Sequence, residues 1–405
     1  MTAPPMPGKL RSITLLALAQ VLAMGLWLIS AAILPELVAE AELAPGRAAL
    51  LSSAVQIGFV FGALVLAIHG TADRHDPRRV LAAAALVAAA VNLGLLVTQP
   101  GGLLQVALRA LTGACLAGVY PVGMKIAVGW GSRDRGFLVG LLVGALTLGS
   151  AMPHLLAVGG GGTEWRGTVA ISSALAALGG LLVLGTGLGP YHAKAPGFDP
   201  GALALAWRNR EVRLAYAGYL GHMWELYVFW TWIGAAASVA FAAHMDAEAA
   251  RDGGRLLAFG AIALGGLLCL PAGALADRIG RARVAQGAMV ASGLAGLGAA
   301  LAFGGPPWLF ALLVLVWGAT IIPDSAQFSA LVADASPPER AGSLMTFQTA
   351  LGFTLTFFTV QAVPWVASVL GWPVTLALMT LGPAAGIVAM QRLIRATRER
   401  LQTLG

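Results

Sequence analysis

The chain has 405 residues, of which 58% are hydrophobic and only 11% are charged, and its net charge is +7. Because an ordinary globular chain has about 45–50% apolar and about 25% charged residues, these proportions exclude a soluble fold, a disordered chain and a coiled coil. At about 20 apolar residues for each membrane helix, the composition provides about twelve spans and predicts an all-α polytopic membrane protein. The two cysteines, Cys115 and Cys269, lie inside apolar runs and indicate neither disulfides nor a thiolate metal site.

In chain order, six apolar runs come first, at residues 12–34, 48–69, 80–98, 102–126, 136–158 and 167–188. The first run follows Lys9 and Arg11 but is too long for a signal-peptide core, so it is expected to remain as an uncleaved span. After a more polar stretch, six further runs lie at residues 212–240, 255–275, 284–303, 308–331, 342–366 and 372–391. The expected domains are an N-terminal six-helix bundle (1–189), a cytoplasmic linker (190–210), a C-terminal six-helix bundle (211–392) and a basic cytoplasmic tail (393–405).

The positive charges follow the side of the membrane that this topology predicts. If both termini are cytoplasmic, twenty of the 25 Lys and Arg residues lie on the inner side, and one, Arg109, lies within a span. The four on the outer side are Arg47, Arg166, Arg251 and Arg255. This bias indicates a multi-pass protein of the inner (plasma) membrane with both termini in the cytoplasm. Since orientation explains the positive charge, no nucleic-acid partner is expected.

The two halves of the chain also echo each other. Three pairs of matching segments are separated by 204–207 residues: Asp73-Arg74 with Asp277-Arg278, Arg135 with Arg340, and Trp165 with Trp372. A nearly constant offset of half the chain indicates a duplicated six-helix unit, which is the architecture of many secondary transporters.

The loop after the eighth span reads Gly273-x-Leu275-Ala276-Asp277-Arg278-x-Gly280-Arg281. This segment resembles the cytoplasmic loop motif of the major facilitator superfamily, and the resemblance extends over nearly all of the chain. The copy in the first half keeps Asp73, Arg74, Arg78 and Arg79 but has Asp76 where the motif has glycine. The resemblance implies twelve transmembrane helices in two pseudo-symmetric six-helix bundles, and secondary active transport by alternating access.

Other segments sharpen the resemblance. Arg109-Ala-Leu-Thr-Gly113 is similar to the span-4 arginine motif that the superfamily associates with proton coupling, whereas span 5 lacks the contiguous Gly-Pro of many antiporters. The segments 221–227 (Gly-His-Met-Trp-Glu-Leu-Tyr) and 324–329 (Asp-Ser-Ala-Gln-Phe-Ser) resemble a bacterial subfamily whose substrates are mostly unassigned.

The two loop motifs are expected to act as a gate. A carboxylate is stabilised at the positive N-terminus of a helix, so Asp277 is expected at the start of span 5 and Asp73 at the start of span 11 when the site opens outward. The arginines of the loops are expected to contact lipid headgroups. The alternative is that each motif is a plain solvated turn.

Three charged residues stand out deep inside predicted spans, where a charge costs about 2.5–3.5 kcal/mol and therefore needs a reason. The first is Glu225, which shares one face of span 7 with His222, Phe229 and Trp232. That face is expected to line the central cavity. Burial away from water favours a neutral carboxyl group, so Glu225 is a candidate proton carrier. The alternative is a protonated side chain that only bridges two helices, and a metal site made of His222 and Glu225 alone would not be closed.

The other two charges are Arg109 in span 4 and Asp324 in span 10. Arg109 could bind a carboxylate of the substrate or approach Glu225 and change its protonation; alternatively, it is a structural partner for backbone carbonyls. Asp324 shares a helix face with Gln327 and is expected to line the cavity; alternatively, it makes a hydrogen bond between helices.

The predicted function is secondary active transport of a small organic solute, coupled to protons. An ATP-driven pump is not supported because the chain has no Gly-x-x-x-x-Gly-Lys-Ser/Thr loop. A membrane enzyme is the alternative from another class, but the six histidines are scattered through the sequence. Efflux of drug-like compounds and uptake of a small anion both remain open. The expected partners are the substrate, protons and the lipid bilayer; no cofactor is expected, and the chain is expected to be a monomer.

Overall fold

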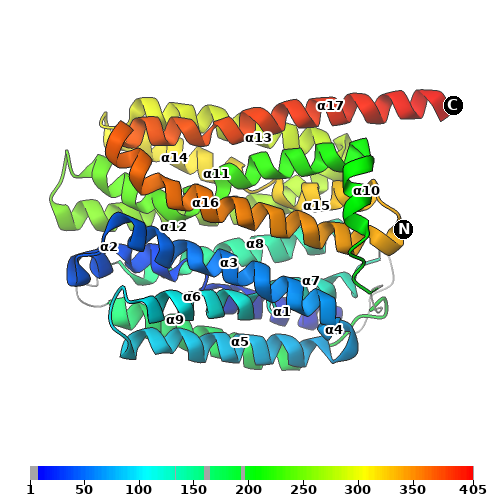
Figure 1. Cartoon of the computed structure of the whole chain (residues 1–405), viewed down its shortest axis with the longest axis horizontal. Helices are drawn as coiled ribbons and strands as arrows, with labels where there is room; N and C mark the ends of the chain where they lie inside the picture. The colour runs from blue at the N-terminus through cyan, green and yellow to red at the C-terminus, as the bar shows by residue number, and fades with distance from the viewer. Residues whose placement is uncertain (1–7, 133, 159–164, 193–196, 405) are drawn as a thin grey trace. The chain divides into compact units, whose positions relative to one another are not determined.

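The computed structural model describes residues 8–132, 134–158, 165–192 and 197–404, and these residues form helices and their connections without any strand (Figure 1). The chain divides into two compact units, Met1–Ala195 (unit 1) and Pro196–Gly405 (unit 2). Arg133 and Lys194, two of the cations counted on the inner side, lie outside the described residues. Four residues near the start of the predicted linker, 193–196, also lie outside them.

Ten helical segments among the described residues are long and apolar enough to cross a membrane. One of them, Pro338–Arg400, has 63 residues and is interrupted at Gly371, whose φ of 79° is not helical, so it contains two spans. Helix α11 (Arg210–Phe241) is not among the ten, but its 32 residues are about 48 Å long, which exceeds the thickness of a bilayer core. These twelve spans confirm the predicted fold class.

In unit 1, the helices are α1 (Lys9–Met24), α2 (Ile29–Ala41), α3 (Pro45–His69), α4 (Thr71–Arg74), α5 (Pro77–Leu93), η1 (Gly94–Val97), α6 (Leu103–Leu116), α7 (Tyr120–Val128), α8 (Arg135–Leu156), α9 (Trp165–Leu182) and η2 (Val183–Gly185). Helix α3 packs along α6, while α9 packs against α1 and α5. The α3–α6 contact needs glycine, because a Cβ atom at Gly113 would lie 2.0 Å from the carbonyl oxygen of Val55. The two backbones therefore touch directly, as in other packed membrane helices.

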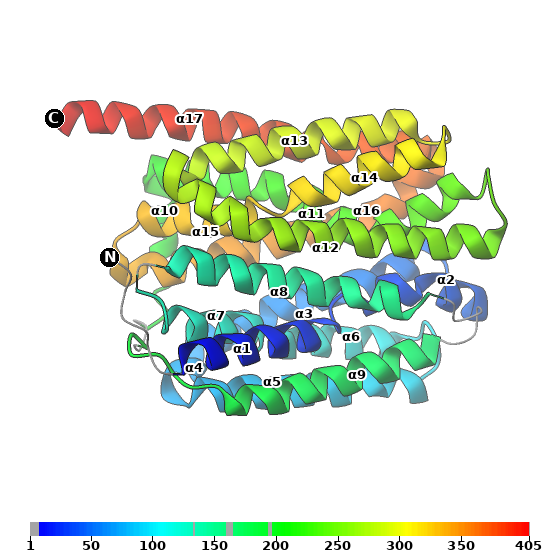
Figure 2. The same ribbon diagram turned by 180° about the vertical axis from the view of Figure 1, so that it is seen from behind.

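In unit 2, the helices are α10 (Ala202–Arg208), α11 (Arg210–Phe241), α12 (Ala247–Ile279), α13 (Arg281–Ala302), α14 (Pro307–Ile321), α15 (Ser325–Asp334), α16 (Pro338–Met379) and α17 (Leu381–Leu404). Figure 2 shows α13 and α14 side by side, and both pack against other helices of the unit. Helix α11 is the central element, since it contacts α12, α14, α15, α16 and α17.

Two helix boundaries differ from the sequence prediction. Helix α12 begins at Ala247, eight residues before the predicted span. Arg255 therefore lies inside the helix rather than at its outer end. Its side chain is only 4% exposed, and Nη1 lies 3.3 Å from Oδ1 of Asp252. Helix α17 continues through the predicted basic tail to Leu404. Hydropathy detects only the part of a helix that crosses the bilayer, and both helices continue beyond that part.

Three predicted spans are broken helices. Span 1 is interrupted between α1 and α2 at residues 25–28, span 4 between α6 and α7 at 117–119, and span 10 between α14 and α15 at 322–324. The breaks in spans 4 and 10 are 205 residues apart, which is the offset of the sequence repeat. The interruption is therefore a feature of the duplicated unit, and it releases backbone carbonyls that need other partners.

Candidate functional site

Glu225 lies in the middle of α11 and is buried inside unit 2. Its Oε1 accepts a hydrogen bond of 2.7 Å from Nε1 of Trp317 on α14, and its Oε2 lies 3.1 Å from Oγ of Ser292 on α13. Phe229, one turn further along α11, packs its ring against Trp317 with 4.9 Å between centroids. Glu225 therefore joins three helices of one bundle. The expectation that this face also lines the central cavity stays a prediction.

His222 and Asp324 form a second buried pair, one turn from Glu225 on α11. Nδ1 of His222 lies 2.9 Å from Oδ1 of Asp324, an ion-pair contact outside the angular range of a good hydrogen bond, and both side chains are at most 2% exposed. Asp324 is the N-cap residue of α15, at the break in span 10. The rings of Tyr219 and Phe328 lie 6.2 and 5.6 Å from the imidazole. The structure thus places two buried carboxyl groups and one imidazole where α11 meets α13, α14 and α15.

The remaining predicted residues of this group lie nearby but have separate contacts. Trp232 donates a hydrogen bond of 3.1 Å from Nε1 to the carbonyl oxygen of Val360 on α16, so it leaves the face that Glu225 and Phe229 share. Gln327 is buried in the first turn of α15, and its backbone N–H bonds to the carbonyl of Asp324. Among the described residues, no group of three or more His, Cys, Asp or Glu side chains could hold a metal.

Arg109 is fully buried in unit 1, on α6. Its Nη2 donates two hydrogen bonds of 2.9 Å to the carbonyl oxygens of Leu26 and Trp27, which are in the break between α1 and α2. Its Nη1 donates to Oδ1 of Asn92 on α5 at 3.1 Å, and Asn92 in turn donates to Ser173 on α9. The guanidinium group therefore supplies the partners that the broken span 1 lacks, which is the structural alternative that the sequence left open.

The first loop motif is closed within unit 1. Asp73 forms an ion pair with Lys125 on α7, whose Nζ also donates to the carbonyl of Ala72 at 2.9 Å. Asp76 is the N-cap of α5 and accepts hydrogen bonds from the backbone N–H and the guanidinium group of Arg78. The Arg78 side chain thereby holds the pKa of the Asp76 carboxyl below its ordinary value. The aspartate that replaces the motif's glycine is thus a helix cap, with an ordinary φ of −61°.

The second loop motif keeps its glycine for a geometric reason. Gly280, between α12 and α13, has a φ of 96°, which side chains other than glycine rarely adopt. Arg281 begins α13, and its Nε lies 3.3 Å from Oδ2 of Asp334 at the end of α15. Asp277 and Arg278 are exposed in the last turn of α12, Gly273 is buried in the same helix, and Arg74 of the first motif is exposed. The predicted contacts of Asp73 and Asp277 across the two halves stay predictions.

Several partners of the site were not found from the sequence. Trp317 and Ser292 hold Glu225, and Lys125 holds Asp73, yet each lies 52 to 92 residues from the residue it contacts. Each is an ordinary residue in an apolar helix, so no local pattern marks it.

Comparison with known proteins agrees with this architecture. The sequence matches the family model of the Major Facilitator Superfamily over residues 16–353. Among solved structures, the fold is similar to a D-xylose-proton symporter (TM-score 0.73, 14% identity, covering 95% of this chain and 97% of the other). It is also similar to the xylose transporter XylE from E. coli in a partially occluded inward-open conformation (TM-score 0.71, 14% identity, 94% and 98% covered).

A third structure, the nucleoside transporter NupG, has a TM-score of 0.70 and 15% identity, with 95% of this chain and 99% of the other covered. Comparison with curated proteins finds no match. At these identities the solved structures support the fold.

Proposed function

Because this chain belongs to the Major Facilitator Superfamily, and is therefore a multi-pass membrane protein of secondary transport, we propose that it moves a small organic solute by alternating access and couples this movement to protons. The observation that supports the coupling is the buried carboxyl group of Glu225 between Trp317 and Ser292. The buried carboxyl group of Asp324, 2.9 Å from His222, is the second candidate for this role.

The surroundings of Glu225 can accommodate both of its protonation states. Oγ of Ser292 lies 3.1 Å from Oε2 of Glu225 and 3.2 Å from the carbonyl oxygen of Met289, but a hydroxyl group has only one proton to donate. When Glu225 is charged, Ser292 donates to it. When Glu225 is protonated, it can donate to Ser292, which then donates to Met289. Neither state leaves a buried donor without a partner, so a proton can be gained or lost at low cost in hydrogen bonds.

The structure argues against one alternative for the substrate. Uptake of a small anion through Arg109 would require the guanidinium group to leave the chain's own oxygens, because both terminal nitrogens donate to oxygens of Leu26, Trp27 or Asn92 and the whole side chain is buried. The structural neighbours include transporters of xylose and of nucleosides. D-xylose and uridine are therefore suitable first probes, followed by a panel of neutral and cationic drug-like compounds.

The orientation is proposed from the charges. Lys9, Arg74, Arg79 and Lys125 lie at the start of α1, in α4, at the start of α5 and in α7, and a contact between Lys9 and Asp134 joins the start of α1 to the start of α8. This basic end of unit 1 is proposed to face the cytoplasm, in the inner membrane, with both termini on that side. The protein is proposed to act as a monomer.

The experiment uses proteoliposomes that contain a trapped pH-sensitive dye. Compounds are first ranked by how much they raise the melting temperature of the purified protein, since a ligand that binds the folded state stabilises it. The best binder is then followed as a labelled solute. In Glu225→Gln, exchange of labelled for unlabelled solute at equal pH should survive, because glutamine keeps the shape and the hydrogen bonds of the protonated acid. Accumulation driven by a pH gradient should be lost.

The matched control is Glu211→Gln, which removes a carboxylate from the first turn of the same helix, where it pairs with Arg400. This variant should keep both activities. Proton-driven accumulation that is unchanged in Glu225→Gln would contradict the role of Glu225 and would make Asp324 the next residue to test.

A further inference from the structure

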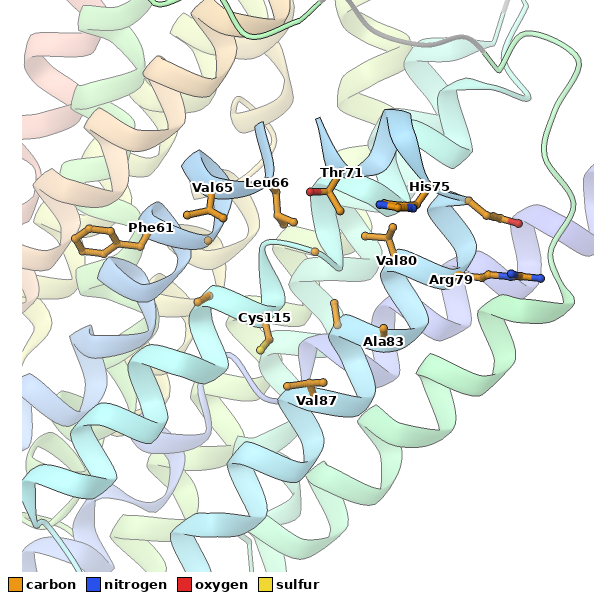
Figure 3. Close-up of a pocket in the computed structure, with 15 residues that line it drawn as sticks. Phe61, Val65, Leu66, Thr71, His75, Arg79, Val80, Ala83, Val87 and Cys115 are labelled. Atoms are coloured by element: carbon orange, nitrogen blue, oxygen red, sulfur yellow. The ribbon is translucent and has the colours of Figure 1, made fainter. Parts of the chain in front are cut away.

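An apolar groove of about 740 Å³ lies on unit 1, between α3, α5 and α6. Figure 3 shows its side chains in a row, with Phe61 at one end and Thr71, His75 and Arg79 at the other. The lining between the two ends is almost entirely aliphatic, and includes Cys115 of α6. Small residues on α5 and α6, with Gly62 on α3 and Gly118 in the break after α6, leave the space open.

The polar end of the groove carries Arg79 beside Asp76, whose carboxyl pKa the charge of Arg79 helps to lower. Arg79 is exposed and makes no hydrogen bond or ion pair within the described part of the chain. Its neighbour Arg78 is fully engaged, with Asp76 and with the carbonyl oxygen of Thr186. Two consecutive arginines therefore have different roles: Arg78 fixes the loop to the end of η2, and Arg79 is available to an external ligand.

The apolar end of the groove is open to its surroundings. Phe61 is 65% exposed, Val65 53% and Val87 49%, and all three belong to spans. In a bilayer, such a surface contacts acyl chains, and a long arginine side chain at the end of a span extends towards the headgroups. The groove volume also falls in the range of about 300–1,000 Å³ that is typical of ligand pockets.

We propose that this groove binds one anionic phospholipid, with an acyl chain along Phe61, Val65, Val87 and Cys115 and with its phosphate at Arg79 and Thr71. The choice of an anionic lipid follows from charge complementarity. The groove opens at the basic end of unit 1, where Arg74 and Arg79 are exposed, and anionic lipids are concentrated in the cytoplasmic leaflet.

A bound lipid would join α3, α5 and α6 on the side of the bundle where the loop of Asp73 and Asp76 lies. Its phosphate would neutralise Arg79, which makes no hydrogen bond within the described part of the chain. The lipid would therefore act as part of the bundle's structure at this loop.

The test is native mass spectrometry of the purified full chain with three probes: dioleoyl phosphatidylglycerol, dioleoyl phosphatidylcholine and glycerol 1-phosphate. The first should bind most tightly, and glycerol phosphate without acyl chains should not compete with it. Arg79→Gln should weaken the binding of phosphatidylglycerol about fivefold, because each basic residue near a membrane surface contributes about 1 kcal/mol to the binding of anionic lipid. Arg11→Gln, which removes another exposed arginine at the same end of unit 1, should have no such effect on this site.

The apolar half of the site has its own pair of variants. Ala83→Phe places a ring in the groove from an exposed position on α5 and should abolish the specific lipid adduct. Ala90→Phe makes the same change two turns further along the helix, at an exposed position outside the groove, and should leave binding unchanged. Equal binding of phosphatidylglycerol and phosphatidylcholine, or unchanged binding in either Arg79→Gln or Ala83→Phe, would overturn the proposal.

A second measurement uses the wild-type chain and does not depend on the folding of a variant. Of its two cysteines, Cys269 is buried and Cys115 lines the groove. Phosphatidylglycerol should slow the modification of Cys115 by a small apolar maleimide more than phosphatidylcholine does at the same concentration. Equal rates with the two lipids would contradict occupation of the groove.

Discussion

Replacing Arg109 by leucine should destabilise the protein rather than only impair transport. The guanidinium group is the partner of two backbone carbonyls, of Leu26 and Trp27, that the break in span 1 removes from the helical hydrogen-bond ladder. Leucine is apolar and shorter than arginine, and it has no donor. The variant therefore leaves two buried acceptors unsatisfied, together with Oδ1 of Asn92.

The size of the effect follows from these bonds. A buried acceptor that loses its partner costs about 1–3 kcal/mol, so the two carbonyls give about 2–6 kcal/mol. Side-chain hydrogen bonds measured within a membrane average about 0.6 kcal/mol, so three bonds give about 2 kcal/mol and set the lower end. Arg109→Lys should lose less, because an ammonium group has three donors but cannot reproduce the geometry of the guanidinium fork.

The assay is thermal unfolding of the detergent-purified protein, followed by tryptophan fluorescence. The melting temperature should fall in the order wild type, Arg109→Lys, Arg109→Leu, and Arg11→Leu, at an exposed position of α1, should match the wild type. If Arg109 instead acts on the substrate, the variants should lose transport while their melting temperature stays the same. That result would refute the structural role argued here.

Two further predictions concern unit 1. Asp76→Ala removes the N-cap of α5 and should lower the free energy of unfolding by about 1 kcal/mol at neutral pH. Arg78 lowers the pKa of Asp76 in the folded state. The stabilisation by Asp76 is therefore present above the unfolded pKa and is lost as the pH falls below about 4. Unfolding at a series of pH values should show the two proteins converging only in acid, and a difference that grows in acid would contradict the assignment. Gly113→Ala should lower the melting temperature, because the new Cβ atom forces α3 and α6 apart at Val55 and reduces the free energy of unfolding by about 1–3 kcal/mol. The control is Gly167→Ala, which has open space around its Cβ position and should leave the melting temperature unchanged. Equal melting temperatures for the two glycine variants would show that the close approach is not a constraint.

The number and order of the spans could be predicted because they depend on composition and periodicity. Each apolar run is long enough to cross the bilayer, and the offset between Asp73 and Asp277 reveals the duplication directly in the sequence. Helix ends could not be predicted as well. Beyond the bilayer a helix can continue with polar residues, as α12 does before Arg255 and as α17 does after Arg392, and hydropathy carries no information about this continuation.

The helix breaks could not be predicted from glycine and proline. Pro35, Pro153, Pro271 and Pro364 lie within helices without ending them. Each break does contain one of the two residues, Gly25, Gly118 or Pro323, but glycines and prolines also lie inside unbroken helices and do not mark a break by themselves. Membrane helices tolerate such residues when neighbouring side chains satisfy the released backbone groups. The position of the break in span 1 is therefore set by a tertiary partner, Arg109, which lies more than 80 residues further along the chain.

The candidate site, like the fold, could be predicted only in part from the sequence. Helical spacing predicted that His222, Glu225 and Phe229 point in one direction, and the structure places all three against α13, α14 or α15. The identity of their partners depends on how distant helices pack. Trp317 and Ser292 have the donors that Glu225 needs, but similar residues occur throughout these helices.

The two duplicated units use their buried charges differently, and this difference supports the proposal that unit 2 carries the proton coupling. In unit 1, the charge of Arg109 is held by oxygens of its own bundle. Because an arginine in a protein keeps its proton, this group can hold the backbone at the break in span 1 but cannot carry a proton through a transport cycle. In unit 2, the break in span 10 carries Asp324, which contacts His222, and Glu225 lies one turn away with a hydroxyl group that can reverse its hydrogen bond. We therefore expect the pseudo-symmetric bundles to have diverged in function, with unit 1 providing a fixed broken helix and unit 2 providing the groups that change charge.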